Sequence, residues 1–200
     1  QLSLAIMKTP IPKQVLRIAL GLLAFILPIV LPLGMLLVGA DKVLMPSIST
    51  YYYSEMQFLF VTILILFGAT FILYGFTTSS RNLVILVGTG IIALLIALVP
   101  THTPGLTEWT GYLHIAHAVL FFALLGWIIR DTFNLPLPYP LLTKIGLYIW
   151  IVEGVLIIYF LTLKWVWPPL VFLLETTILW LFVFGLWVRN KVTRELGKAS

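Results

Sequence analysis

The feature that most constrains this chain is a series of six apolar segments, each about as long as a membrane is thick. They cover approximately residues 15–39, 56–76, 82–100, 111–130, 144–163 and 168–188. A helix needs about 20 mostly apolar residues to cross the hydrocarbon core of a bilayer. With 61% hydrophobic and 10% charged residues, the chain has too few polar groups to cover a surface in water. The sequence therefore predicts a multi-pass membrane protein.

Prolines mark several of the breaks between these segments. Pro100 and Pro104 follow the third segment, and Pro168 and Pro169 open the sixth. Backbone groups in hydrocarbon have to pair within their own segment, and the alternating strands of a membrane barrel are absent from the sequence. We therefore expect an all-α, polytopic membrane bundle of six transmembrane helices that forms a single domain over residues 1–200.

Two short patterns predict how particular helices behave. Pro28 and Pro32 lie one turn apart in the first segment, where each removes a helical hydrogen bond, so this helix should kink or unwind locally. Gly88, Thr89 and Gly90 form a patch of small residues in the third segment. In an apolar helix such a patch indicates close packing against a neighbouring helix rather than a phosphate-binding loop.

Basic residues predict the orientation of the bundle. Ten of the twelve Lys and Arg residues fall on one side, namely Lys8, Lys13, Arg17, Arg81, Arg130, Lys144, Arg189, Lys191, Arg194 and Lys198, whereas Lys42 and Lys164 fall on the other. Because basic residues stay on the cytoplasmic side, both termini should be cytoplasmic. The formal charge of +5 then reflects topology, and we expect membrane lipids rather than nucleic acid as partners.

One polar stretch, PSISTYYYSEMQ at residues 46–57, interrupts this apolar sequence on the side that should face away from the cytoplasm. Such a loop could line or cover a polar cavity, in which case the candidate pocket residues are Ser47, Ser49, Tyr51 and Tyr52. Alternatively, tyrosines 51–53 could join Trp109, Trp165 and Trp167 in an aromatic belt at the level of the lipid head groups.

Ionisable residues within the last three segments are the strongest pointers to a site. These residues are His114, His117, Glu153 and Glu175. A charge at the centre of a bilayer costs at least about 2.5–3.5 kcal/mol, so such side chains usually face the interior of the bundle and find partners. At a rise of about 1.5 Å per residue, all four should lie in the non-cytoplasmic half. We expect them to share a polar pocket open to that side, and we find no buried charge in the cytoplasmic half.

The chemistry of this pocket stays open at the level of sequence. His114 and His117 share a helix face and, with Glu175, could bind zinc or another divalent metal. Acid–base catalysis without a metal is a second possibility. In a third, each histidine bonds a loop carbonyl or a tyrosine hydroxyl, and Glu175 bonds a Ser, Thr or Tyr. The chain has no cysteine, no dense metal-binding motif, and no nucleophile-elbow or nucleotide-binding motif.

Several short motifs resemble a group of uncharacterised bacterial six-helix membrane proteins. The matching positions are Pro46, Ser47, Ser49, Tyr51 and Tyr52 in the loop, Pro100-Thr101, Leu113-His114 and Leu174-Glu175. More distantly, the chain is similar to the DRAM/FRAG/SFK superfamily, whose members are tied to lipid remodelling and membrane-organelle regulation. The resemblance implies a bacterial inner (plasma) membrane. Where the close group carries an Arg-Asp pair, this chain has Met56-Gln57-Phe58, which favours an accessory role.

Three hypotheses of function follow. The first is a protein without catalytic activity that interacts with lipids or serves as an accessory subunit of a membrane complex. The second is a membrane-embedded lipid hydrolase or remodelling enzyme, with or without a metal. The third is a transporter that uses Glu153 and Glu175, although the sequence shows no inverted repeat.

Overall fold

The computed structural model describes residues 12–78, 80–99, 108–131, 139–163 and 166–199. Six α-helices and one short 3₁₀ helix account for most of them. The elements are α2 (Lys13–Leu37), η2 (Ile48–Tyr53), α3 (Gln57–Phe76), α4 (Ser80–Leu98), α5 (Glu108–Arg130), α6 (Pro140–Thr162) and α7 (Pro169–Ala199). Within these ranges the fold is entirely helical, as the apolar segments predict.

Five of the helices, namely α2, α3, α5, α6 and α7, are long and apolar enough to cross a membrane. The sixth, α4, is also apolar but shorter, with its apolar part at Asn82–Leu98. The molecule is therefore a helical membrane bundle, and the prediction of a multi-pass membrane protein is confirmed. That all six helices cross the membrane stays a prediction.

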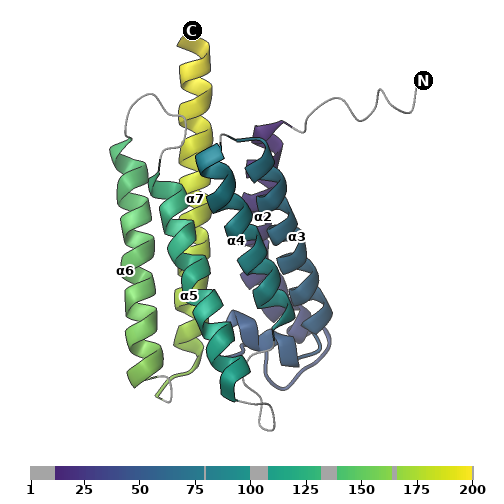
Figure 1. Cartoon of the computed structure of the whole chain (residues 1–200). Helices are drawn as coiled ribbons and strands as arrows, with labels where there is room; N and C mark the ends of the chain where they lie inside the picture. Colours follow the sequence, from purple (N-terminus) through teal and green to yellow (C-terminus); the bar gives the residue numbers. More distant parts are fainter. Residues whose placement is uncertain (1–11, 79, 100–107, 132–138, 164–165, 200) are drawn as a thin grey trace, which may run out of the picture.

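The long helices alternate in direction, so the bundle has two distinct ends (Figure 1). At one end α2 begins and α7 finishes, and we call this the terminal end. At the other end lie η2, the start of α5 and the start of α7, and we call this the η2 end. Helices that follow one another pack together, and α7 also packs against α2, which closes the bundle into a ring.

Aromatic side chains fill the centre of this ring. The ring centroids of Phe67 on α3 and Phe121 on α5 are 5.8 Å apart, and those of Phe71 on α3 and Phe182 on α7 are 5.9 Å apart. All four residues are at most 3% exposed. Such edge-to-face and tilted contacts add about 0.5–1.5 kcal/mol per pair beyond the burial of area. They tie the first half of the bundle to the second.

Glycines bring two pairs of helices into close contact. A Cβ atom at Gly90 of α4 would lie 2.5 Å from the carbonyl oxygen of Gly68 on α3. A Cβ atom at Gly146 of α6 would lie 2.7 Å from the carbonyl oxygen of Gly126 on α5. The second contact lies near the terminal end, and from there α5 and α6 diverge toward the η2 end (Figure 1). This divergence leaves room between them for a pocket.

The last helix is longer than its apolar segment. We expected it to end near residue 188, but α7 continues to Ala199, because hydropathy marks the length of a span and not the length of a helix. Its extension buries Arg189, which is 3% exposed. The expectation of no buried charge in the half of the bundle that carries the termini is therefore wrong. Helix α2 is continuous across Pro28 and Pro32, so it does not unwind there, and the alternative of a kink stays a prediction.

Candidate functional site

The polar loop before α3 folds around its own side chains. Ser47 is the N-cap of η2: its hydroxyl accepts a hydrogen bond from the Thr50 N–H at 3.3 Å, and the Thr50 hydroxyl accepts one from the Ser47 N–H at 3.1 Å. This reciprocal pair is a capping box, which satisfies backbone donors that the start of a helix leaves free. The Ser-x-x-Thr spacing therefore has a structural role that the sequence analysis missed.

Tyr51 anchors the loop and does not line the pocket. Its ring is fully buried and packs on Phe172 of α7. Its hydroxyl donates to the Val43 carbonyl at 2.9 Å and accepts from the Met45 N–H at 3.3 Å. Burial raises the pKa of the Tyr51 phenol above its ordinary value, so the phenol keeps the proton that it donates. Because the ring is buried, the alternative of an aromatic belt is wrong for Tyr51.

The start of α7 holds η2 in place through two hydrogen bonds to the backbone of the loop. The carboxylate of Glu175 accepts a hydrogen bond of 2.6 Å from the Ile48 N–H, and the Phe172 N–H donates to the Pro46 carbonyl at 3.0 Å. The first N–H groups of a helix have no partner within it, so the loop satisfies one of them. Glu175 thus bonds a backbone group, whereas the hydrogen-bond partners expected for it were Ser, Thr or Tyr side chains.

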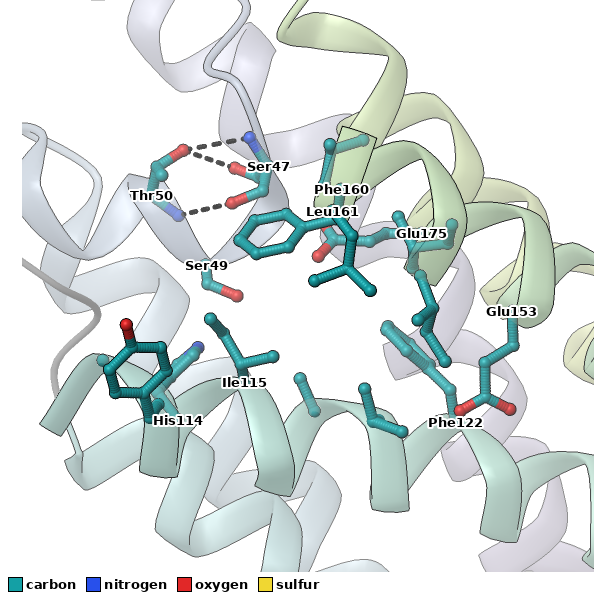
Figure 2. A pocket seen from close by; sticks show the side chains of 17 residues that line it. Ser47, Ser49, Thr50, His114, Ile115, Phe122, Glu153, Phe160, Leu161 and Glu175 are labelled. Atoms are coloured by element: carbon teal, nitrogen blue, oxygen red, sulfur yellow. Dashed lines mark hydrogen bonds between the residues drawn. The ribbon is translucent and has the colours of Figure 1, made fainter. Parts of the chain in front are cut away.

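A cavity of about 360 Å³ lies behind this loop. Its wall comes from η2 and the residue before it, α5, α6 and α7, and it is mostly apolar. The polar members of the wall are Ser47, Ser49, Thr50, Tyr112, His114, Glu153 and Glu175. Figure 2 shows Ser49 and His114 at one end of the cavity and Glu153 at the other. The cavity thus occupies the space between the diverging ends of α5 and α6.

His114 presents one nitrogen without a partner. The side chain is 4% exposed, and its Nδ1 lies 2.8 Å from the carbonyl oxygen of Val99. A carbonyl only accepts, so Nδ1 carries a proton, and Nε2 of the neutral ring is an acceptor. Nε2 has no hydrogen-bond partner among the residues described. For the histidines the sequence predicted either a loop carbonyl or a tyrosine hydroxyl as partner, and at His114 the partner is the Val99 carbonyl.

Glu153 is the second polar group without a full set of partners. It lies in the middle of α6 and is 6% exposed. Its Oε1 atom is buried and has no hydrogen-bond partner within the described ranges. A buried polar atom without a partner costs roughly 1–3 kcal/mol, and more when it is charged. A ligand that donates to Glu153 would remove this cost.

The structure brings together five of the eight candidate pocket residues. Ser47, Ser49, His114, Glu153 and Glu175 line the cavity, whereas Tyr51, Tyr52 and His117 do not. Tyr52 is half-buried, and its ring meets that of Tyr53 edge to face. His117 is half-buried, and its Nδ1 has no partner in the part of the chain that is described.

No group of three or more His, Asp and Glu side chains within the described ranges is arranged to hold a metal ion. His117 lies outside the cavity wall that includes His114 and Glu175. A zinc or other divalent-metal site at His114, His117 and Glu175 stays a prediction, as do the hydrolase, the transporter and the accessory subunit.

Two polar members of the pocket wall, Thr50 and Tyr112, were missed from the sequence. Thr50 could have been found from its capping spacing to Ser47. Tyr112 lies near the start of α5, two residues before His114, and residues at that spacing do not share a helix face, so helical periodicity did not point to it. Its side chain is 64% exposed, so it stands at the mouth of the cavity on the outer surface of the bundle.

Fold and cavity together define the class of this protein: it is a multi-pass helical membrane protein with a mostly apolar pocket at one end of the bundle. No protein-family model, no curated protein and no solved structure matches the chain. The resemblance to six-helix bacterial membrane proteins stays a prediction.

Proposed function

We propose that this protein binds a membrane lipid or a similar amphiphile in the cavity between α5, α6 and α7. The observation that carries this proposal is the composition of the wall. An apolar lining such as Val119, Phe122 and Leu156 suits a hydrocarbon chain, and a few polar groups suit a head group. Ligand pockets are typically apolar with a small number of placed polar groups, in cavities of about 300–1,000 Å³.

The position of the cavity supports entry from the bilayer. Two of its lining residues, Tyr112 on α5 and Leu161 on α6, are 64% and 75% exposed. They lie on the divergent ends of the two helices, where the surface of the bundle would face lipid. An amphiphile could therefore pass between α5 and α6 without leaving the membrane.

All six helices cross the membrane in this proposal. Helix α4 has 19 residues, which gives a length of about 28 Å at 1.5 Å per residue, close to the thickness of the hydrocarbon core. It also packs along α3 through Gly68 and Gly90. With the basic residues at the terminal end, both termini are cytoplasmic and the pocket faces the other side. Together with the resemblance, this orientation leads us to propose a bacterial inner membrane as the location of the protein.

Photolabelling tests the binding of lipid. The protein, in phosphatidylcholine nanodiscs, is titrated with a phosphatidylcholine that carries a photoactivatable chain, and labelled residues are identified by mass spectrometry. We expect labelling of the α5 and α6 residues that line the cavity to saturate, because a site has a fixed capacity. Labelling of lipid-facing residues such as Phe58, which is 82% exposed, should rise linearly.

A matched pair of variants provides the control. Ala118→Phe places a ring in the cavity, and we expect saturable labelling to fall by about tenfold, which corresponds to about 1.4 kcal/mol. Ala116→Phe makes the same change at an exposed position on the same helix and should leave labelling unchanged. If labelling of the cavity residues fails to saturate with every lipid probe, the proposed function is wrong.

A further inference from the structure

Resting on the proposed function, we infer that the ligand of this cavity carries a protonated amine, which the carboxylate of Glu153 binds. The hydrogen-bonding groups that the wall of the cavity offers, and those that it lacks, favour such a ligand. Four observations carry it: the state of His114, the carboxylates of Glu153 and Glu175, and the absence of a basic group from the wall.

His114 contributes an acceptor. Its Nδ1 proton is committed to the Val99 carbonyl at 2.8 Å, so the buried Nε2 atom has a lone pair and no partner in the described part of the chain. A ligand at this end of the cavity has to bring a donor. A hydroxyl, an amide N–H or an amine meets this requirement, whereas a carboxylate or phosphate oxygen does not.

The carboxylates of Glu153 and Glu175 differ in the hydrogen-bond partners that the protein gives them. Glu175 already accepts the Ile48 N–H at 2.6 Å, which gives it a structural partner. The side chain of Glu153 is only 6% exposed, and its buried Oε1 atom accepts no hydrogen bond from the described residues. A buried carboxylate is stable only when a cation or strong donors surround it. Of the two, Glu153 is therefore the group that a cationic ligand would complete.

The wall itself supplies no positive charge. Neither Lys nor Arg is among the described residues that line the cavity. An anionic head group would thus meet two carboxyl groups and a neutral imidazole, with only hydroxyl groups as donors. An ammonium group, by contrast, supplies three donors and the missing charge to a carboxylate, and charge-assisted hydrogen bonds of this kind are about twice as strong as neutral ones.

His114 and Glu153 lie at opposite ends of the cavity (Figure 2). One small ion could not reach both, so the ligand is extended. With its ammonium at Glu153, a second donor of the same molecule can reach His114 Nε2 near Ser49, and the apolar wall between them contacts its carbon skeleton. The chemical class is therefore an amine-bearing amphiphile.

Four photoactivatable probes test this inference with the unsubstituted protein in phosphatidylcholine nanodiscs. Three share one long alkyl chain and end in an amine, an alcohol or a carboxylate. The fourth is a phosphatidylethanolamine, which distinguishes a lipid head group from a free amine as the source of the ammonium. We expect one or both amine probes to half-saturate the cavity at a concentration about tenfold lower than the alcohol or the carboxylate requires.

Variants then locate the ammonium. Glu153→Gln keeps the size and one acceptor but removes the charge, so the concentration of the amine probe that half-saturates the cavity should rise by about tenfold and the preference for amine over alcohol should disappear. Glu55→Gln, at an exposed glutamate of the η2 end, should retain the preference. Equal half-saturation by alcohol, carboxylate and amine on the unsubstituted protein would overturn the inference and leave lipid binding standing. Saturation by none of the probes would overturn the proposed function as well.

Discussion

At the scale of single residues, Glu175 links the loop to the pocket. Its carboxylate lines the cavity and at the same time accepts the Ile48 N–H, so one side chain sets the position of η2 and the polarity of the site. The sequence marks Glu175 as unusual, because a carboxylate in an apolar segment is costly. Its partner lies 127 residues away on a backbone nitrogen, which no side-chain pattern reveals.

We predict that Glu175→Leu lowers the free energy of unfolding by about 1–3 kcal/mol, because the buried Ile48 N–H loses its acceptor. Glu175→Gln retains an acceptor oxygen and should lose less than half as much. Unfolding of the purified protein in mixed micelles, followed by circular dichroism, measures both values. Thr177→Val is the control, since Thr177 is exposed on the same helix and its hydroxyl bonds to the Leu173 carbonyl within that helix. Equal stability of the Leu and Val variants would show that the contact with Ile48 contributes nothing.

At the scale of helices, small residues determine where the bundle is tight and where it opens. Gly126 and Gly146 hold α5 against α6 near the terminal end, and the two helices separate toward the η2 end, where the cavity lies. The Gly-Thr-Gly patch of α4 predicted a packed face. The structure divides the patch: Gly90 contacts α3 and Thr89 is fully buried, whereas a Cβ atom at Gly88 would meet nothing within 4 Å.

This division predicts opposite effects of the same substitution two residues apart. Gly90→Ala should destabilise the protein by about 1–3 kcal/mol, because the added methyl group collides with the backbone of α3 at Gly68. Gly88→Ala should be neutral or stabilising by up to about 1 kcal/mol, because alanine is the better helix former and the space is open. The same mixed-micelle unfolding measures both. A Gly90→Ala variant as stable as Gly88→Ala would contradict the close contact of α3 and α4.

At the scale of the whole molecule, the two ends of the bundle differ in chemistry. Described basic residues such as Lys13, Arg17, Lys144 and Lys191 lie at the terminal end, whereas the cavity and η2 lie at the other. Basic residues flanking transmembrane helices stay in the cytoplasm. In our proposal this difference orients the pocket toward the non-cytoplasmic leaflet.

Cysteine labelling tests this orientation cleanly, because the natural sequence has no cysteine. Asp41→Cys and Glu195→Cys replace exposed acidic residues at the η2 end and the terminal end. In intact cells a membrane-impermeant maleimide should label Asp41→Cys, and it should label Glu195→Cys only after permeabilisation. Trp109→Cys, at a residue that is 72% exposed, should behave like Asp41→Cys if α4 crosses the membrane. If Trp109→Cys is labelled only after permeabilisation, as expected for Glu195→Cys, α4 does not cross the membrane.

The sequence by itself determined the class of fold and the approximate position of every long helix, because the cost of exposing backbone and charge to hydrocarbon acts on each segment separately. It also identified His114, Glu153 and Glu175 as costly residues that need partners. Only the tertiary structure decided that Tyr51 anchors the loop, that His117 lies outside the cavity, and that Arg189 is buried near the terminal end. These outcomes depend on how neighbouring helices rotate and diverge, and that follows from contacts between side chains far apart in the chain, which hydropathy along one segment does not contain.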